Sequence, residues 1–339
     1  MIVVTGAAGF IGANLVAALN ARGAKDIVVA DVFKAAGAAP PATTRYLDQL
    51  QVAERVDKDN LPRRLDAHAR SLNAVFHLGA CADTTAADRA FVMENNFEYS
   101  CALWQWCARR GVPFIYASSA ATYGDGAAGY DDESDPRPLK PLNLYAESKQ
   151  RFDLWALEQR SAPPRWVGLK YFNLYGPREE HKGRMASVAF HAFRQIAQSG
   201  QVRLFQSHRA GIADGAQQRD FTYVADAVEA TLHFLDTSAS PSAPNGLYNV
   251  GTGQARTFAE LANAVFAALG RPPDILYVPM PEDIRSRYQY FTQATTAKLR
   301  RAGFTRPFRS LEQGVREYVA YLTKGERRKT KGERRKEKG

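Results

Sequence analysis

The chain has 339 residues, and its apolar and charged fractions of 45% and 24% are those of an ordinary globular protein with one large domain or two packed lobes. No run of 18 or more apolar residues occurs, so we expect no membrane span and no membrane partner. The chain enters a strand pattern at once, without the basic and apolar start of a signal peptide. Cys81, Cys101 and Cys107 form no CxxC pair and no ligand cluster, so we expect reduced thiols, a cytoplasmic location and no metal site.

The net charge of +10 is concentrated at the C-terminus. Residues 324–339 (KGERRKTKGERRKEKG) contain nine Lys or Arg and three Glu, a net +6, which leaves +4 for the rest of the chain. This segment has no apolar residue to bury, so we interpret it as a disordered or frayed helical tail. A basic tail can also contact RNA, DNA or anionic lipid, but a solvated tail explains the composition, and we predict no nucleic-acid partner.

Strands and helices alternate in the first half of the chain. Residues 1–5 are a short apolar run rich in β-branched residues, as in a strand buried on both faces of a parallel sheet. A glycine-rich turn and a helix follow. Further strands are predicted at residues 27–30, 74–77, 113–117 and 166–171, and further helices at 91–109 and 143–158. This alternation predicts an α/β fold with a Rossmann-type, doubly wound parallel sheet over residues 1–173.

The second half is less regular and contains many Pro and Gly residues. Helices are predicted at residues 185–199 and 257–269, and extended segments at 201–205 and 275–278. We expect residues 174–323 to form mainly a smaller, mixed α/β substrate-binding lobe, with some segments returning to the first lobe. Residues 35–41 (AAGAAPP) show no periodicity and are predicted to form a loop.

A GxxGxxG sequence, with glycines at 6, 9 and 12, lies between the first strand and the first helix. Gly6 suits a tight turn, Gly9 a close approach of the backbone to a pyrophosphate, and Gly12 close packing of helix on sheet. Such a turn can also occur without a ligand. Its position at a helix N-terminus, where N–H groups are free, favours a dinucleotide site.

An acid, Asp31, ends the second predicted strand, where it would accept a hydrogen bond from a ribose hydroxyl. A carboxylate at this place repels a 2′-phosphate and favours NAD over NADP. Lys34 and Arg45 lie nearby in sequence and would have the opposite effect. The alternative for Asp31 is a polar end of a strand without a ligand.

Tyr145 and Lys149 form a Tyr-x-x-x-Lys pair on a predicted helix, where the spacing places both on one face. A phenol is a poor base at neutral pH, and a nearby ammonium group lowers its pKa. Tyr145 can then take a proton from a substrate hydroxyl as hydride leaves the carbon. A surface pair is the default reading of this spacing alone. Ser119, at the end of a preceding strand, supplies a hydroxyl that can orient the same oxygen, and the ordered set is more specific than any member.

The chain resembles the extended short-chain dehydrogenases/reductases, the NAD-dependent epimerases and dehydratases, over about residues 1–322. The family-like segments are residues 77–80 (HLGA), 95–96 (NN), 118–124 (SSAATYG), 171–177 (YFNLYGP), 219–221 (RDF) and 249–253 (NVGTG). Dehydratases carry an Asp-Glu pair before the Tyr-Gly that follows the serine strand. Ala121 and Thr122 stand there instead, which argues against dehydration. The retained Tyr145 and Lys149 also disfavour a regulatory protein that only senses a dinucleotide.

Within this family the chain looks like the ADP-L-glycero-D-manno-heptose 6-epimerases. The resemblance rests on residues 116–124, 175–191 (YGPREEHKGRMASVAFH) and 287–293 (RYQYFTQ). It implies epimerisation at C6″ of an ADP-linked heptose in lipopolysaccharide assembly, through a 6-keto intermediate. It also implies a homo-oligomer, such as a pentamer, with one tightly bound NADP or NAD per chain. Lys182 would be a second acid/base beside Tyr145, although sequence alone favours an exposed charge there.

The resemblance also implies binding residues. Near the cofactor it places Gly6, Gly9, Phe10, Ile11, Gly12, Asp31, Val32, Lys58, Leu78, Gly79, Ala80, Cys81, Ala82, Asn95, Lys149 and Leu174. Near the substrate it places Ser119, Asn173, Arg184, His191, Phe205, Gln206, Ser207, His208, Arg219 and Tyr288. The guanidinium fork of Arg219 matches a diphosphate, whereas a single His on a helix, such as His191, is often structural.

Several positions depart from the family pattern. Val32 replaces the usual Asn, and residues 35–41 replace a basic segment that reads a phosphate, so NADP and NAD both stay open. Glu147 adds a charge to the catalytic helix, and residues 210–217 look like an insertion. These departures keep open an epimerase or reductase of another nucleotide sugar, such as a GDP-heptose or a UDP-hexose.

Overall fold

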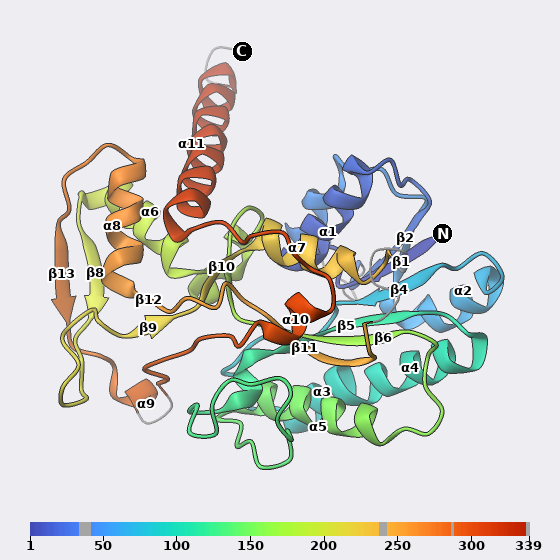
Figure 1. Cartoon of the computed structure of the whole chain (residues 1–339). Helices are drawn as coiled ribbons and strands as arrows, with labels where there is room; N and C mark the ends of the chain where they lie inside the picture. The colour runs from blue at the N-terminus through green and yellow to red at the C-terminus, as the bar shows by residue number, and fades with distance from the viewer. Residues whose placement is uncertain (34–41, 237–242, 286–287, 337–339) are drawn as a thin grey trace.

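The computed structural model describes residues 1–33, 42–236, 243–285 and 288–336, and its centre is a seven-stranded sheet (Figure 1). The strand order is β11-β6-β5-β4-β1-β2-β3, and every neighbouring pair is parallel. The predicted fold class is therefore confirmed. The strands are β1 Ile2–Thr5, β2 Ile27–Asp31, β3 Glu54–Asp57, β4 Ala74–His77, β5 Phe114–Ser119, β6 Trp166–Tyr171 and β11 Gly246–Val250. Lys34, the predicted loop 35–41 and Arg287 lie outside the described residues.

Helices cover both faces of this sheet, because alternate side chains of each strand point to opposite faces. Ile2 and Val4 of β1 join an apolar cluster with α1 and α7, whereas Val3 joins a second cluster with α2, α4 and α5. Figure 1 shows α1 and α7 on one side and α3, α4 and α5 on the other. The helices are α1 Phe10–Ala21, α2 Leu61–His68, α3 Arg89–Met93, α4 Tyr99–Arg110, α5 Leu144–Glu158, α7 Val224–His233 and α10 Ala297–Arg301.

Two strands of the sheet were not predicted from the sequence. β3 reads ERVD and lies at one edge, where only Val56 is buried, so it has no apolar run. β11 lies at the other edge and is buried along its whole length. It is separated from its neighbour β6 by much of the second lobe, and nothing local in GLYNV distinguishes it from a strand of that lobe.

The predicted helix at 91–109 is three segments. A π-helical turn, η3 (Glu94–Glu98), separates α3 from α4. Such turns insert an extra residue into a helix and often lie beside functional sites. Here the turn carries Asn95, which lines the cleft described below, and Asn96, which is buried.

A third apolar cluster holds the smaller lobe together, between α6 (Val188–Ser199), α8 (Phe258–Ala268) and the start of α11 (Leu311–Lys336). α6 begins at residue 188 rather than 185, because Ser187 caps its N-terminus. A capping box between Thr257 and Glu260 starts α8. The other elements are β7 Asn173–Tyr175, β8 Val202–Phe205, β9 Gln218–Arg219, β10 Phe221–Tyr223, β12 Arg256–Thr257, β13 Ile275–Val278, α9 Glu282–Arg285 and the 3-10 segments η1 Ala42–Leu47, η2 Lys58–Asn60, η4 Ala120–Tyr123 and η5 Glu180–Met185.

The basic C-terminal segment was expected to be either disordered or a frayed helix, and the structure has a helix there. α11 (Leu311–Lys336) continues through it as a helix that projects from the body, while residues 337–339 lie outside the described range (Figure 1). Buried side chains such as Val315 and Leu322 anchor its first turns, and Lys, Arg and Glu then favour continuation of the helix. No helix among the described residues is both long and apolar enough to cross a bilayer.

Candidate functional site

A cleft of about 840 Å³ opens at the carboxyl ends of the central strands, where doubly wound sheets bind their ligands. All four residues predicted to be catalytic line it, and so do all those predicted to hold the cofactor. Of the residues predicted to bind substrate, three line it: Ser119, Asn173 and Arg219. The remaining seven do not, and their positions are given below.

The glycine turn is tightly packed, and each of its three glycines is required for a different structural reason. Gly6 has φ +63°, and a Cβ on it would lie 2.6 Å from the Gly79 backbone. A Cβ on Gly12 would lie 2.1 Å from the Gly6 carbonyl oxygen, so the helix could not approach the strand. Gly9 is the N-cap of α1 and has no side-chain cap, so the first N–H groups of the helix are free beside the cleft. This cradle fits a pyrophosphate.

Asp31 occupies the end of β2 at the rim of the same cleft. Its carboxylate accepts hydrogen bonds from the backbone N–H of Ala8 and of Val32, both at 2.8 Å. Burial raises the pKa of Asp31, while these two hydrogen bonds lower it. His181 also lines this region, and its Nδ1 is buried without a hydrogen-bond partner among the described residues. A carboxylate with remaining lone pairs and a free ring nitrogen fit the hydroxyls of a bound ribose.

The cleft brings together Ser119, Tyr145 and Lys149, as the sequence predicted. The pKa of Tyr145, however, shifts in the direction opposite to the predicted one. Burial raises the pKa of Tyr145, and the opposing contribution is its hydrogen bond with Ser119. The expectation that Lys149 lowers this pKa is therefore wrong for the free protein. The Lys149 ammonium group instead donates to the Ala117 carbonyl oxygen at 2.8 Å, and burial lowers its pKa to about 8. Desolvation penalises both charged forms.

A buried ion pair that sequence reasoning missed lies behind this trio. Asp153 is one helical turn beyond Lys149 on α5, and its carboxylate is 2.7 Å from the Lys170 ammonium group of β6. Both side chains are almost fully buried. Asp153 also accepts hydrogen bonds from Tyr116 and Ser118 of β5, at 2.9 and 2.7 Å. The pair therefore fixes α5 against the two strands that flank the catalytic residues.

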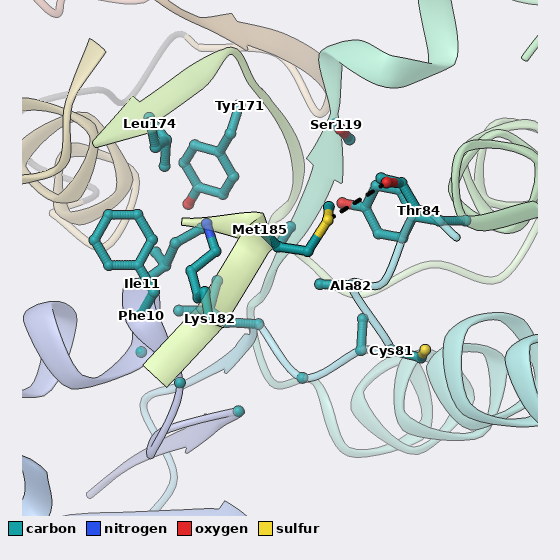
Figure 2. Close-up of a pocket in the computed structure, with 18 of the residues that line it drawn as sticks. Phe10, Ile11, Cys81, Ala82, Thr84, Ser119, Tyr171, Leu174, Lys182 and Met185 are labelled. Carbon is teal, nitrogen blue, oxygen red and sulfur yellow. Dashed lines mark hydrogen bonds between the residues drawn. The ribbon is translucent and has the colours of Figure 1, made fainter. Parts of the chain in front are cut away.

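Lys182 reaches the cleft from a loop segment rather than from a long helix. It belongs to η5, and its ammonium nitrogen lies 5.0 Å from the centre of the Phe10 ring of α1. Figure 2 shows its side chain extending toward Phe10 and Tyr171. Burial lowers the pKa of Lys182, and the negative charge of Glu179 opposes that shift. The exposed charge that sequence alone favoured is therefore not what the structure has.

Arg219 is a buried cation that lines the cleft. It is only 6% exposed, its guanidinium lies 5.5 and 5.2 Å from the ring centres of Phe258 and Tyr288, and it donates to the carbonyl oxygens of Gln218 and Gln289. No carboxylate among the described residues forms an ion pair with it. A desolvated guanidinium without an anionic partner favours binding of an anion.

Comparisons with known proteins show the family of the chain. The NAD dependent epimerase/dehydratase family model matches residues 2–251. The chain belongs to this family. A protein of Fusobacterium nucleatum subsp. nucleatum named ADP-L-glycero-D-manno-heptose-6-epimerase is 44% identical, over 96% of this chain and 98% of the relative. A protein of the same name from Nitratidesulfovibrio vulgaris is 47% identical, over 94% of this chain and 97% of the relative.

Solved structures of two epimerases have the same architecture. The Helicobacter pylori ADP-L-glycero-D-manno-heptose-6-epimerase superposes with a TM-score of 0.76 at 28% identity, covering 95% of this chain and 96% of that one. The Thermus thermophilus UDP-glucose 4-epimerase in complex with NAD gives a TM-score of 0.74 at 28% identity, covering 95% and 98%. The cofactor of this protein is accordingly a nicotinamide dinucleotide.

The seven predicted substrate residues outside the cleft lining lie on its rim or in the second lobe. Arg184 donates to the Thr85 hydroxyl at 2.6 Å, so it joins η5 to the loop after β4. Tyr288 stacks on Arg219 and reaches the site only through it. His191 lies on α6, Phe205 ends β8, and Gln206, Ser207 and His208 form the turn after it. The apparent insertion at 210–217 is tied to this turn by the Asp214 carboxylate, which accepts from the Ser207 N–H at 2.7 Å.

Several residues that line the cleft could not be predicted as site residues from the sequence. Thr84 donates to the Met185 sulfur at 3.9 Å, and Figure 2 shows this contact between the loop after β4 and η5. Both loops lack a periodic pattern, so their meeting depends on tertiary structure. Helical phase offered a usable signal for Asp153, which follows Tyr145 and Lys149 at the same spacing. The other unpredicted lining residues are Thr5, Ala30, Thr43, Phe91, Tyr99, Ala117, Ser118, Tyr171, Phe172, Tyr175, His181, Ala186, Ser187, Val188, Phe221, Phe258 and Leu261.

Proposed function

We propose that the protein converts ADP-D-glycero-D-manno-heptose to ADP-L-glycero-D-manno-heptose by epimerisation at C6″. The observation that carries this proposal is the identity of 44–47% over almost the whole chain with relatives named for that activity. The cleft supports it, because Tyr145 and Lys182 supply two proton-handling groups to one cavity. An epimerase that works by oxidation and re-reduction at one carbon has to manage a proton for each configuration of the alcohol.

The cofactor would be held by the glycine turn, Asp31 and the N-terminus of α1. When bound, the nicotinamide would accept hydride from C6″, giving a 6-keto sugar, and return it to the opposite face of the carbonyl. Asp31 favours NAD, because it presents a negative charge to the ribose. Arg45, whose charge acts on His181, adds positive charge near that ring and favours NADP, whereas burial lowers the pKa of His181 and so favours its uncharged form. The mass of the nucleotide released by denaturing the purified protein distinguishes the two forms.

The residues of the chain divide the proton work. Tyr145, oriented by Ser119, would take the proton from the C6″ hydroxyl of one epimer, and Lys182 would protonate or deprotonate the oxygen of the other. Burial raises the pKa of Tyr145 in the free protein, so its phenol has to lose a proton before it can serve as this base. Lys149 would stabilise the phenolate once substrate has entered.

Arg219 would bind the diphosphate of the substrate. Its position at the cleft, its burial and its lack of an ionic partner in the described residues suit two phosphate oxygens. We also propose, on the family resemblance, that the protein acts in the cytoplasm in lipopolysaccharide inner-core assembly, as a homo-oligomer such as a pentamer.

The decisive assay is turnover of both epimers of ADP-glycero-manno-heptose by the purified protein, followed by chromatography of the sugar nucleotides. Interconversion of the two epimers is expected. The second candidate is an epimerase or reductase of a GDP-heptose or a UDP-hexose, which Val32 and the turn around residues 210–217 favour. Conversion of one of those sugars, with neither ADP-heptose converted, would overturn the leading assignment.

A further inference from the structure

Glu179 is a fully buried carboxylate for which the mechanism above has no use. It lies three residues before Lys182, at the start of the loop that carries that lysine into the cleft. No Lys or Arg forms an ion pair with it within the described residues. Burying a charge without a cation is costly unless hydrogen-bond donors surround it. The site around Glu179 therefore has to be built from other groups, and these groups identify its role.

The carboxylate of Glu179 joins the two ends of the Lys182 loop. One oxygen accepts from the Gly176 N–H at 3.1 Å and from the Ser187 hydroxyl at 2.7 Å, and the other accepts from the Ser187 N–H at 2.7 Å. Gly176 precedes the loop, and Ser187 caps the N-terminus of α6. One side chain thus brings together backbone groups that are eleven residues apart, with Lys182 between them.

The backbone of this loop is strained where it leaves β7. Arg178 has φ +71° and is the one residue other than glycine with positive φ among the described residues. Such a conformation persists only when surrounding contacts hold it. Asn14 of α1 supplies two of them: it donates to the Pro177 carbonyl oxygen at 2.8 Å and accepts from the Arg178 guanidinium at 2.8 Å. The loop is therefore held against the helix whose N-terminus faces the cofactor region.

Charge links Glu179 to the lysine directly. Glu179 is the acidic group that raises the pKa of Lys182 against the effect of burial. The other titratable groups nearby are Glu180 and His181 on the same loop and Tyr318 of α11, which interacts with Glu179. From α1 the facing group is the uncharged Phe10 ring. A buried negative charge close to an otherwise desolvated ammonium group favours its protonated form.

We propose that Glu179 is the positioning residue of Lys182: it closes the loop from Gly176 to Ser187 and so presents the ammonium group to the cleft. This inference rests on the proposed function, in which Lys182 is the second acid/base. Glu179 touches neither substrate nor cofactor in this account and acts only through Lys182. Loss of its carboxylate is therefore expected to reproduce a loss of Lys182, in a milder form.

The test compares Glu179→Gln with Lys182→Met in single turnovers of the holoenzyme, started from each epimer in turn and followed by the absorbance of the reduced nicotinamide. A glutamine has one acceptor oxygen and cannot satisfy both fixed N–H groups. Lys182→Met is expected to slow oxidation of one epimer, and Tyr145→Phe that of the other. Glu179→Gln should slow the Lys182-dependent epimer about 10-fold to 100-fold, as small misplacements do, and leave the other within about twofold.

Glu180→Gln is the matched control, because it removes one negative charge from the same loop. The Glu180 residue is half-buried, and its carboxylate accepts from the Tyr46 hydroxyl of η1 at 2.8 Å. Both epimers should react within about twofold of wild type in this variant. Glu179→Asp keeps the charge and shortens the side chain. It replaces Glu179→Gln if that variant does not fold, and it is also expected to slow only the Lys182-dependent epimer.

Each outcome separates the two proposals. Suppose that Lys182→Met slows one epimer. If Glu179→Gln or Glu179→Asp then slows both epimers equally, or slows neither, the positioning role is overturned and the two-base function stays intact. If Lys182→Met slows neither epimer, the two-base assignment itself fails. Slowing confined to the Lys182-dependent epimer supports the positioning role, because a general loosening of the fold would affect both.

Discussion

Tyr145 and Lys182 line one cleft but are held by very different structures. Tyr145 stands on α5, a 15-residue helix, and the buried Asp153–Lys170 pair fixes that helix against the sheet. Lys182 stands on a short loop segment, which a buried carboxylate and contacts to α1 hold in place. A helix repeats its geometry every turn, so one packed face positions several residues. A loop has no such repeat, and each of its anchors has to be placed separately.

The largest expected effect is on the support of the helix. Asp153→Asn removes the buried partner of Lys170 and should lower the free energy of unfolding by about 3–5 kcal/mol, since an uncompensated ammonium group stays buried. Urea unfolding measures this. Glu147→Gln is a suitable control, because it breaks the exposed pair with Arg89 and should cost about 0–1 kcal/mol. Similar losses in the two variants would contradict the importance of the buried pair.

On the helix side of the comparison, Tyr145→Phe removes the phenolic hydroxyl and leaves the packing of α5 in place. We expect kcat for epimerisation to fall by about 100-fold or more, as for loss of a general acid/base. Thermal unfolding should change little. Activity near that of wild type would show that another group handles this proton.

On the loop side, Lys182→Met keeps the length of the side chain and removes the charge. The same fall of about 100-fold in kcat is expected. Steady-state assays of both epimers measure it, with the melting temperature as a check on folding. If this variant retains near-full activity, Lys182 does not handle a proton, and only Tyr145 of the two residues keeps that role.

A smaller effect is expected from pH. Burial holds the pKa of Lys149 at about 8 in the folded protein, below the ordinary lysine value of about 10.4. The unfolded chain therefore binds more protons between these values, so the Lys149 contribution to stability is present above the unfolded pKa and is lost as pH falls through about 8. Urea unfolding across this window should show a steeper rise with pH for wild type than for Lys149→Met. Parallel curves would contradict the shift.

The smallest expected effect is at the start of α5. The Asn143 side chain accepts from the Ala146 N–H at 2.9 Å and caps the helix two residues before Tyr145. Asn143→Ala should cost about 0.5–2 kcal/mol of stability. Because the buried ion pair still holds the helix, kcat should change little, and a large loss of activity would show that the cap, rather than the pair, positions Tyr145.

This contrast also explains how far the sequence could predict the site. The glycine turn and the Tyr145–Lys149 pair depend on local geometry, on a turn and on helical spacing, and the sequence alone placed them beside the cofactor region. The involvement of Lys182 came from family resemblance, because a lysine in an aperiodic loop looks like any exposed charge. Helical spacing puts Asp153 on the face of α5 that carries Lys149, but it does not show the partners of Asp153, which lie on β5 and β6. Glu179 was missed, because nothing local marks its contacts across the loop.

The fold itself divides in the same way. Strands with apolar, β-branched runs were found, whereas β3 lacked such a run and β11 had no neighbour in sequence to mark it. The sign of the Tyr145 pKa shift was also mispredicted, because the sequence shows the nearby lysine but not the burial that raises this pKa.

During synthesis of the chain, β11 emerges long after β6, the strand with which it pairs. β6 ends at Tyr171, but the strand that pairs with it begins at Gly246, so a growing chain exposes an unfinished sheet edge while the second lobe is synthesised. Open edges of apolar strands promote association with other chains. A fragment that stops at residue 173 would keep this edge permanently, so an expression product cut at the apparent lobe boundary is a poor choice for producing a soluble cofactor-binding unit.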